Sequence, residues 1–279
     1  MVISIASGKG GTGKTTIAVN LALSLNGQER VQFLDCDVEG PNAHIFLKPD
    51  FYYEKPVEIP VPAVDEARCS YCGRCAEVCS FHAIAVIKDH VLTFPELCHG
   101  CGGCIRFCPE KAITEIGRHI GVVRRGVAGE IDFVQGTLDI GEAISPPLIK
   151  AVKRLIQRDQ TVILDAPPGT SCPAVETVKG SDFCLLVTEP TPFGLNDLSL
   201  ATHMVRKLGV PAGVVINRSD VGDGRVDRFC EEQGIPILMR IPWDTRLSEL
   251  YALGEPVAQS GSEWKAVFLR LFEDLQRVV

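Results

Sequence analysis

Long apolar runs are missing from this 279-residue sequence, and none approaches the ~20 residues needed to cross a bilayer. An excess of basic residues is also missing, because 28 Lys and Arg face 35 Asp and Glu, for a formal charge of −7. That balance argues against a broad nucleic-acid-binding face, which needs clustered cations. The first strand is predicted to begin at Val2, which leaves no room for a signal peptide. We expect a cytoplasmic protein that binds neither nucleic acid nor membrane.

Cysteine, by contrast, is abundant, with twelve residues in the chain. Without a secretion signal, and in the reducing cytoplasm that we expect, these cysteines are better interpreted as metal ligands than as disulfides. The length and the 46% hydrophobic content allow a sizeable core, in one large domain or in one large and one small domain.

The stretch SGKGGTGKTT, residues 7–16, lies between a short apolar run, Val2–Ala6, and a segment with helical periodicity. Its Gly-x-x-x-x-Gly-Lys-Thr pattern, in this strand–loop–helix context, predicts a phosphate-binding loop for ATP. Glycines let successive backbone N–H groups turn toward phosphate oxygens. Lys14 is placed to reach the β- and γ-phosphates, and the Thr15 hydroxyl to ligate Mg²⁺. A Gly-rich turn that matches by chance is the alternative. The expected nucleotide-binding residues are Gly8, Lys9, Gly10, Gly11, Thr12, Gly13, Lys14, Thr15 and Thr16.

Lys9 directly follows the first glycine of this loop. In this respect the run resembles the deviant-Walker-A ATPases, the superfamily of MinD/ParA, Mrp and the nitrogenase iron protein. In that family the extra lysine reaches the partner's phosphates across a nucleotide-sandwich dimer. The resemblance therefore implies an ATP-dependent homodimer in which Lys9 is catalytic. A solvated loop lysine is the alternative.

Aspartates follow two further apolar runs, in Asp35-Cys36-Asp37 and in the stretch DAPPGT that begins at Asp165. In the resembled family, an aspartate of switch I positions the attacking water, and Asp37 matches that place better than Asp35. Strand-end capping by either residue is the alternative. Asp165 fits the Walker B arrangement, in which a carboxylate holds the Mg²⁺ shell. DAPPGT resembles switch II, which implies that the Gly169 N–H senses the γ-phosphate.

Two later strand ends resemble the base pocket of the same family. Asn217 follows a predicted strand at 213–216 and matches the adenine-contacting residue, although a turn cap accounts for it equally well. Pro242 and Trp243 follow a strand predicted at 237–241 and match another part of that pocket.

Eight of the cysteines form two quartets with the spacing C-x₂-C-x₂-C-x₃-C, repeated 29 residues apart. Ala83-Ile84 recurs as Ala112-Ile113 at the same offset, so the repeat extends beyond the ligands. Over roughly residues 64–116 the chain resembles a bacterial two-cluster ferredoxin. In such proteins three cysteines of a quartet hold one [4Fe–4S] cluster and the fourth belongs to the other. The implied ligand sets are Cys69, Cys72, Cys75 and Cys108 for one cluster, and Cys98, Cys101, Cys104 and Cys79 for the other.

The two halves of this repeat differ at one position, because Pro109 follows the last cysteine of the second quartet whereas Ser80 follows that of the first. We expect an altered local backbone or cluster potential there, but no lost cluster. A pair of zinc sites is the alternative, although zinc modules usually present C-x₂-C pairs.

The rest of the chain indicates how these motifs are arranged. The Pro- and aromatic-rich segment 48–62 predicts an extended linker at a domain boundary. Strands are predicted at 119–124 and 130–134, and Ser145 is predicted to cap a helix at 148–157. Alternating strands and helices predict an α/β fold with a doubly wound, mostly parallel sheet. The expected domains are an ATPase domain in two parts, 1–62 and 117–279, and a small α+β ferredoxin insertion at 63–116.

The C-terminal segment 263–279 has an apolar helical stripe. MinD-type proteins can end in a membrane-binding helix, but the charges on this segment balance, whereas a surface-binding helix is rich in Lys and Arg. Core packing is therefore expected. Of the other cysteines, Cys184 and Cys230 are expected to be buried, and Cys36 and Cys172 lie beside the two switches. Cys172 could supply a ligand to a cluster between subunits, as in the iron-protein branch of the resembled family. However, that branch and the Mrp-type scaffolds each bring two cysteines per subunit, and this chain has no C-terminal C-x₂-C.

Two functions follow from these features. In the first, an ATP-driven dimer gates electron transfer from the two clusters to an unidentified redox partner. In the second, the protein is a cluster-assembly factor or carrier, or a MinD-like docking switch, that delivers to or recruits an acceptor protein. Complete quartets favour the first, since a carrier needs labile clusters.

Overall fold

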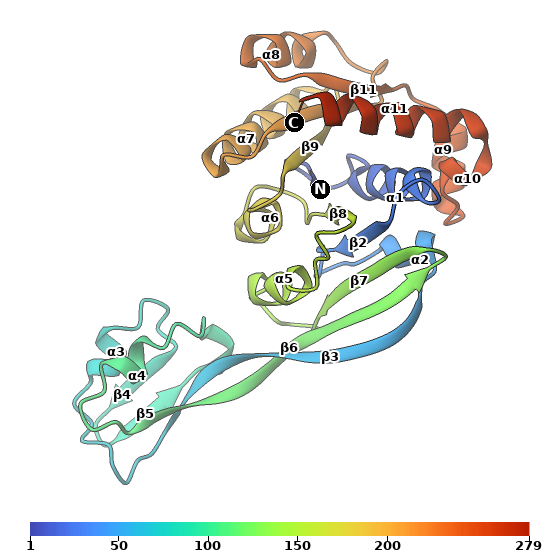
Figure 1. The fold of residues 1–279 in the computed structure, drawn as a ribbon. Coiled ribbons are helices and arrows are strands. Elements are labelled where there is room, and N and C mark those ends of the chain that lie inside the picture. Colours follow the sequence, from blue (N-terminus) through green and yellow to red (C-terminus); the bar gives the residue numbers. More distant parts are fainter. Residues whose placement is uncertain (279) are drawn as a thin grey trace.

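A nine-stranded sheet forms the body of the molecule in the computed structural model, which describes residues 1–278 (Figure 1). Its strands are β1 (Val2–Ala6), β2 (Val31–Asp35), β3 (Asp50–Val64), β6 (Ile113–Ala128), β7 (Ile131–Leu138), β8 (Thr161–Asp165), β9 (Phe183–Thr188), β10 (Ala212–Asn217) and β11 (Ile237–Ile241). They lie in the order β11-β10-β9-β1-β8-β2-β7-β6-β3. Every pair from β11 to β7 is parallel, whereas β6 and β3 are antiparallel to their neighbours. The predicted α/β fold with a mostly parallel sheet is confirmed.

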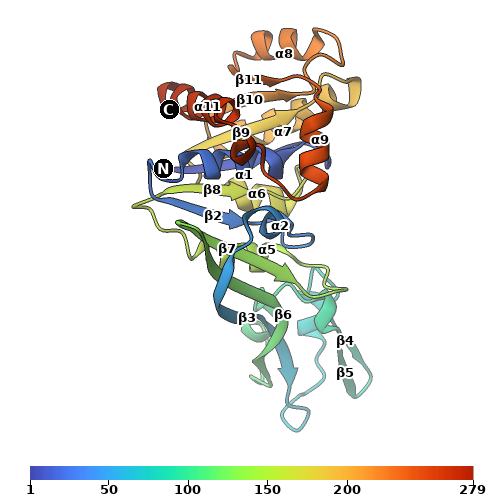
Figure 2. The same cartoon turned by 90° about the vertical axis from the view of Figure 1, so that its right-hand side faces the viewer.

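Helices cover both faces of this sheet, which is why β1, β2, β8 and β9 are apolar runs that are buried at every residue. α1 and α11 pack on one face, and α5, α6, α7 and α8 on the other (Figures 1 and 2). The helices of the body are α1 (Lys14–Leu25), α2 (Ala43–Leu47), α5 (Pro146–Lys153), α6 (Cys172–Val178), α7 (Pro192–Leu208), α8 (Arg225–Gln233), α9 (Thr245–Ala252), α10 (Val257–Ser260) and α11 (Ser262–Val278).

β3 and β6 run without a break from the sheet into a small lobe, which they carry at the end of a two-stranded ribbon (Figure 1). β6 leaves β7 at Gly121, the last residue that pairs with β7, and a β-bulge in the β3–β6 pairing lies at the same point. A Cβ on Gly121 would lie 2.4 Å from the Thr137 carbonyl oxygen, so only glycine fits this departure. The lobe holds α3 (Arg74–Glu77), β4 (Ile84–Ile87), β5 (His90–Thr93), the 3₁₀ helix η1 (Pro95–Leu97) and α4 (Gly103–Arg106).

Segment 48–62 is extended, as predicted, but it is mostly a strand of the sheet and not a free linker. Its prolines explain why it forms the edge. Pro56, Pro60 and Pro62 are separated by even numbers of residues, so they occupy the same side of β3 and present no N–H there for a further strand. Residues 63 and 116, the expected limits of the insertion, both lie within strands of the ribbon.

The strands predicted at 119–124 and 130–134 are parts of β6 and β7. The helix predicted at 148–157 begins and ends earlier, as α5, with prolines in its first turn. Ser145 is the N-cap residue of this helix, as predicted, but its side chain makes no capping hydrogen bond. Its backbone is helical, with φ −86° and ψ −26°, and its hydroxyl donates to Glu39 Oε1 at 2.8 Å.

The apolar stripe of α11 packs in the core, as expected. Phe268, Leu271, Phe272 and Leu275 are buried beside α1, whereas Val278 is 42% exposed; Val279, also in the expected segment, lies outside the described residues. Among residues 1–278, no helix combines the length and the apolar character needed to cross a bilayer.

Truncating the stripe of α11 tests its packing. Leu275→Ala is expected to lower the free energy of unfolding by about 2–4 kcal/mol, because Leu275 is fully buried and its removal leaves a cavity. Val278→Ala, on the same helix but exposed, is the matched control and is expected to change it by less than about 0.5 kcal/mol. Urea unfolding measures both. Equal effects, or sedimentation of the intact protein with liposomes in the presence of ATP, would contradict the core assignment.

Candidate nucleotide site and cysteine lobe

The phosphate loop connects β1 to α1, and its glycines are required by geometry. Gly11 and Gly13 have φ values of 78° and 95°, the left-handed region that glycine tolerates best. A Cβ on Gly8 would lie 2.2 Å from the Asp197 carbonyl oxygen. Gly13 precedes the first turn of α1, whose free N–H groups and positive dipole end favour a bound anion. The loop thus has the backbone of an anion site.

Three aspartates lie together at the carboxyl edge of β2 and β8, and two of them, Asp165 and Asp37, interact with the Lys14 ammonium. Asp35 lies opposite Asp165 in the parallel pairing, and Asp37 follows two residues after Asp35. Burial raises the pKa of Asp165 to about 7 and that of Asp37 to about 6. Burial also lowers the pKa of Lys14, while Asp165 and Asp37 oppose that change. One cation thus faces several buried carboxyl groups.

The partners of Asp35 and Asp165 differ. Asp35 accepts hydrogen bonds from the backbone N–H groups of Asp37, Asn42 and Ala43 at 3.1–3.2 Å, so it anchors the segment after β2. Both carboxylate oxygens of Asp165 are buried without a hydrogen-bond partner among residues 1–278. Mg²⁺ is typically held by one or two carboxylates together with phosphates and waters, so the orphaned Asp165 and the nearby Thr15 hydroxyl fit a Mg²⁺–nucleotide complex.

A cavity of about 430 Å³ opens beside the loop and lies between α1, α2, and α9 to α11. Asp165, Gly8, Lys9, Thr12 and Gly169 are predicted site residues that do not line this cavity. The predicted residues that do line it are Gly10, Gly11, Gly13, Lys14, Thr15, Thr16, Asp37, Asn217, Pro242 and Trp243.

Two of the predicted site residues, Asn217 and Gly169, are hydrogen-bonded to the phosphate loop. Asn217 Nδ2 donates to the Thr12 carbonyl at 2.9 Å, and Asn217 Oδ1 accepts from the Arg218 N–H at 3.0 Å, so the side chain serves the turn as well as facing the cavity. The Gly169 N–H donates to the Ser7 carbonyl at 3.0 Å, which joins the switch II segment to the phosphate loop.

Glu189 and Arg218 are site residues that the sequence analysis missed. Glu189 is buried at the end of β9, where its carboxylate pairs with Lys9 Nζ at 3.3 Å and with Arg218 Nη1 at 2.7 Å. The Arg218 guanidinium also lies 4.9 Å from the centre of the Trp243 ring, a cation–π contact. The rule that selected Asp165, a carboxylate directly after an apolar strand at the carboxyl edge, applies equally to Glu189.

Two small cavities in the lobe are each lined by four cysteines, three from one quartet and one from the other. The proximal cavity, next to β3 residues 60–62, is lined by Cys79, Cys98, Cys101 and Cys104. The distal cavity is lined by Cys69, Cys72, Cys75 and Cys108. These sets are the two that the ferredoxin resemblance implies. Among residues 1–278, no group of three or more His, Cys, Asp or Glu side chains is arranged to hold a single metal ion.

Backbone N–H groups donate hydrogen bonds to four of the cysteine sulfurs, and these bonds recur at positions 29 residues apart, as the sequence repeat does. Cys69 Sγ and Cys98 Sγ each accept from the N–H two residues later at 3.4 Å. Cys79 Sγ and Cys108 Sγ each accept from the N–H four residues later at 3.3 Å. Such bonds stabilise a thiolate ligand. They are equal in both halves, so the change from Pro109 to Ser80 does not alter the backbone at this bond. The chemistry of the donor set fits two clusters.

The remaining cysteines lie outside these cavities. Cys36, Cys184 and Cys230 are buried, as expected for Cys184 and Cys230, and burial raises the pKa of the Cys230 thiol to about 11. Cys172 is exposed at the start of α6.

Comparison with known proteins identifies the body of the molecule. Residues 3–257 match the model of the CobQ/CobB/MinD/ParA nucleotide binding domain. An uncharacterized protein of Methanocaldococcus jannaschii is 31% identical over the whole chain and 98% of its own length. The iron-sulfur cluster carrier protein of Pyrococcus furiosus is 27% identical over 98% of this chain and 84% of its own. The septum site-determining protein MinD of Pyrococcus horikoshii, solved with Mg-ADP, has a similar fold, with a TM-score of 0.58 and 20% identity over 98% of this chain and 95% of its own.

Asp165→Asn tests the buried charge. The native pKa of about 7 exceeds the ordinary 3.8, so the native state retains a proton that the unfolded chain loses, and Asp165 costs stability as the pH rises from about 4 to 7. The neutral amide is expected to raise the free energy of unfolding of the nucleotide-free protein by on the order of 2–4 kcal/mol at pH 8, and by little below pH 4.

The same variant is expected to abolish the increase in melting temperature produced by Mg-ADP. Asp159→Asn, at an exposed position, is the control and is expected to change neither property. A destabilised Asp165→Asn protein that still responds to Mg-ADP would contradict the assignment. Thermal and urea unfolding across this pH range provide the measurements.

Proposed function

The chain belongs to the CobQ/CobB/MinD/ParA nucleotide-binding family, and from that premise we propose that it is an ATP-dependent switch that carries two [4Fe–4S] clusters and gates electron transfer to a partner protein. One observation carries the coupling: a single continuous strand leads from the nucleotide site to the cysteine lobe. β3 begins 13 residues after Asp37 and ends five residues before Cys69.

In the proposed ATPase reaction, the loop N–H groups and Lys14 bind the β- and γ-phosphates. Thr15 and Asp165 would hold a Mg²⁺ ion, which would neutralise negative charge on the phosphates. Asp37 orients the water that attacks the γ-phosphorus. Its pKa of about 6 leaves it mostly ionised at neutral pH, so it is able to accept a hydrogen bond from that water. Trp243, Pro242 and Asn217 surround the base.

Lys9 acts between subunits in this proposal. Within one chain the Lys9 ammonium is paired with Glu189, and Arg218 is paired with the same carboxylate. When Lys9 moves away, the buried Glu189 carboxylate therefore still has a cationic partner. Lys9 then exchanges Glu189 for the phosphates bound to the partner chain, and the dimer forms only when ATP is present. Arg218 keeps Glu189 paired and keeps its own contact with Trp243.

The proximal and distal cysteine sets hold the two clusters, each with three cysteines of one quartet and the fourth of the other. When bound, a [4Fe–4S] cluster in each cavity would supply one-electron transfer between a donor protein and an acceptor protein. Tyr71, Ala83, Gly100 and Ala112 donate their N–H groups to the ligand sulfurs and stabilise the thiolates. These bonds and the interlocked quartets favour clusters that remain in place through the ATPase cycle.

A second candidate is a cluster carrier. It is favoured by relatives named iron-sulfur cluster carrier proteins, at 25–27% identity across nearly the whole chain. Against it, the described residues outside the lobe include only one exposed cysteine, Cys172, as a site for a labile cluster. The two candidates differ in whether iron leaves the protein.

Paired substitutions test the ligand sets. The reconstituted protein is expected to hold about eight irons per chain, four for each cluster. Cys72→Ser with Cys75→Ser, and the equivalent Cys101→Ser with Cys104→Ser, are each expected to reduce this number by about half. Cys172→Ser is the control that retains all eight. Iron analysis and anaerobic EPR make the measurement, and zinc in place of iron would overturn the proposal.

Nucleotide dependence tests the gating. In an EPR-monitored redox titration, replacing Mg-ADP with a non-hydrolysable ATP analogue is expected to shift a cluster's reduced-to-oxidised ratio several-fold, where tenfold is ~59 mV for one electron. Lys9→Ala is expected to bind Mg-ADP normally but to lose both this shift and the ATP-dependent dimer seen by light scattering. Iron that moves to an apo-ferredoxin during ATP turnover would favour the carrier instead.

A further inference from the structure

Arg118 lies on β6 where the body of the molecule meets the lobe. Its guanidinium forms a two-point ion pair with the Glu142 carboxylate, with Nη2 at 3.2 Å from Oε1 and Nη1 in contact with Oε2. The side chains are only 18% and 5% exposed, so solvent screens this pair weakly. Arg118 Nε is buried without a partner among residues 1–278. Neither residue belongs to the ATPase or ligand sets described above.

On one side, Arg118 lies close to the segment that carries Cys98, one of the cysteines of the proximal cavity. Cys98 packs against a hydrophobic cluster that contains Ile59 and Ile120. Ile59 lies opposite Arg118 in the pairing of β3 with β6, and Ile120 follows Arg118 by two residues on β6. The turn that follows Cys98 lies against β3 at Pro60, the residue after Ile59. A Cβ on Gly100 of this turn would be 3.1 Å from the Pro60 carbonyl oxygen. The pKa of Arg118 is raised chiefly by its hydrogen bond to Glu142, with smaller contributions from the charges of Glu96 and Cys98. By its packing, therefore, Cys98 of the proximal cavity lies beside the pair of strands to which Arg118 belongs.

On the other side, Glu142 belongs to the loop between β7 and α5, and this loop is attached to switch I. Glu142 Oε1 accepts from the Ile144 N–H at 3.1 Å, and the next residue, Ser145, donates to Glu39 at 2.8 Å. At the start of the loop, the Leu138 N–H donates to the Val38 carbonyl at 2.9 Å. Val38 and Glu39 directly follow Asp37. The segment after Asp37 is thus hydrogen-bonded to both ends of the loop that holds Glu142.

We infer that Arg118, held by Glu142, is the positioning residue through which the nucleotide state at switch I changes the electrostatic environment of the proximal cluster. This inference rests on the proposed function, because it requires ATP at Asp37 and a cluster at Cys98. Reduction adds negative charge to a cluster, so a nearby cation favours the reduced form and a nearby anion opposes it. Among the described residues, Arg118 and its loop line neither cavity, but Cys98, which lies near Arg118, belongs to the proximal set and not to the distal set.

Two substitutions are expected to act in opposite directions. Arg118→Gln removes the cation and leaves Glu142, so the reduced-to-oxidised ratio of the proximal cluster at a fixed potential is expected to fall about tenfold, ~59 mV for one electron. Glu142→Gln leaves the cation less neutralised, so the ratio is expected to rise by several-fold. General loosening of the lobe would move both variants in the same direction.

The matched control is Arg125→Gln. Arg125 lies seven residues further along β6 and forms the same two-point pair with Asp132, at 2.8–2.9 Å, but within the body of the sheet. It is expected to leave both clusters unchanged. The distal cluster, identified by the loss of the other signal in the Cys101→Ser and Cys104→Ser protein, is an internal control in every variant.

Hydrogen exchange tests the connection to switch I separately. In the full chain, the Leu138 and Ile144 amides are expected to exchange several-fold more slowly with the ATP analogue than with Mg-ADP. Ser145→Ala is expected to remove this difference, whereas Ser260→Ala, at a hydroxyl bonded only within α10, is expected to keep it.

The outcomes separate this inference from the proposed function. A protein that holds about eight irons and dimerises with ATP, but whose Arg118 and Glu142 variants titrate like the wild type, overturns the inference and leaves the proposed function intact. Shifts of the same sign, or of equal size in Arg125→Gln, overturn it as well. A protein without iron overturns both.

Discussion

Negative charge buried at the carboxyl edge of the sheet is the constraint on which the nucleotide site depends. The parallel register of β2 and β8 sets Asp35 opposite Asp165, and burial raises the pKa of both. Asp35 is compensated by three backbone N–H groups, whereas Asp165 has no hydrogen-bond partner in the described chain. Lys14, which is itself buried, compensates only part of this charge. The site is therefore destabilised until a cation and its phosphates arrive, which is how strain at a functional site favours ligand binding.

The edge of the sheet imposes a second constraint, because β3 must leave the body without exposing an edge to other chains. Prolines on one side of β3 remove donors that a further strand would need, and β6 covers the other side along its whole length. Gly121 and the adjacent bulge allow β6 to depart from β7 at a defined point. The lobe is thus carried on a paired ribbon and not on a flexible tether, so its two strands move with the elements to which they are joined.

The local motifs were predictable from the sequence because short spacing determines them. The phosphate loop and the cysteine quartets each occupy a few residues with a strict pattern, and the alternation of strands and helices predicted the parallel sheet. The contacts between distant segments were not predictable. Ser145 was predictable as the N-cap residue of α5, but its contact with Glu39 across 106 residues was not.

Pairings of charged residues were missed for the same reason. Lys9 and Glu189, or Arg118 and Glu142, are ordinary surface-type residues until the fold brings them together. Segment 48–62 was interpreted as a linker because proline and aromatic residues are common in connections, whereas pairing with β6 makes it an edge strand. An edge strand tolerates proline on its unpaired side, so composition alone does not distinguish the two.

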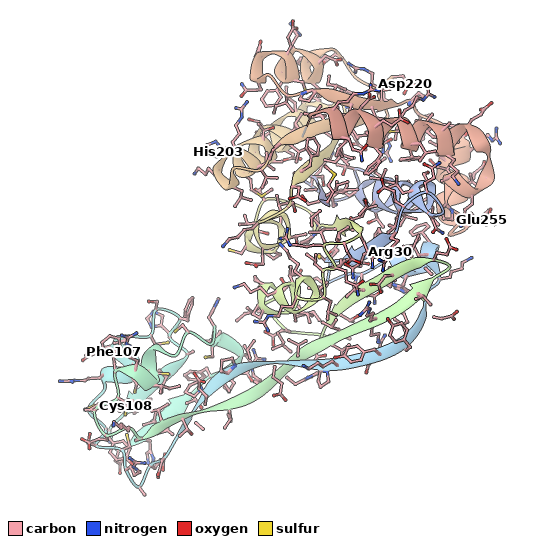
Figure 3. The ribbon with its side chains drawn as sticks, in the orientation of Figure 1. Arg30, Phe107, Cys108, His203, Asp220 and Glu255 are labelled. Atoms are coloured by element: carbon pink, nitrogen blue, oxygen red, sulfur yellow. The ribbon has the colours of Figure 1, made fainter. Side chains whose placement is uncertain are left out.

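Distance determines how ATP can affect the lobe. Figure 3 shows Cys108 in the lobe far from Glu255, which lines the nucleotide cavity on the other side of the body. At physiological ionic strength charges are screened over about 8 Å, so the γ-phosphate acts only weakly on the cysteine sets through the field alone. In the proposed function, the influence of ATP therefore passes through structure, and two routes leave the segment after Asp37. One follows the chain through α2 and β3, which ends five residues before Cys69. The other passes through the β7–α5 loop, whose Glu142 pairs with Arg118 on β6. The second route ends in a charged pair, so under this proposal we expect the proximal set to respond more strongly than the distal set.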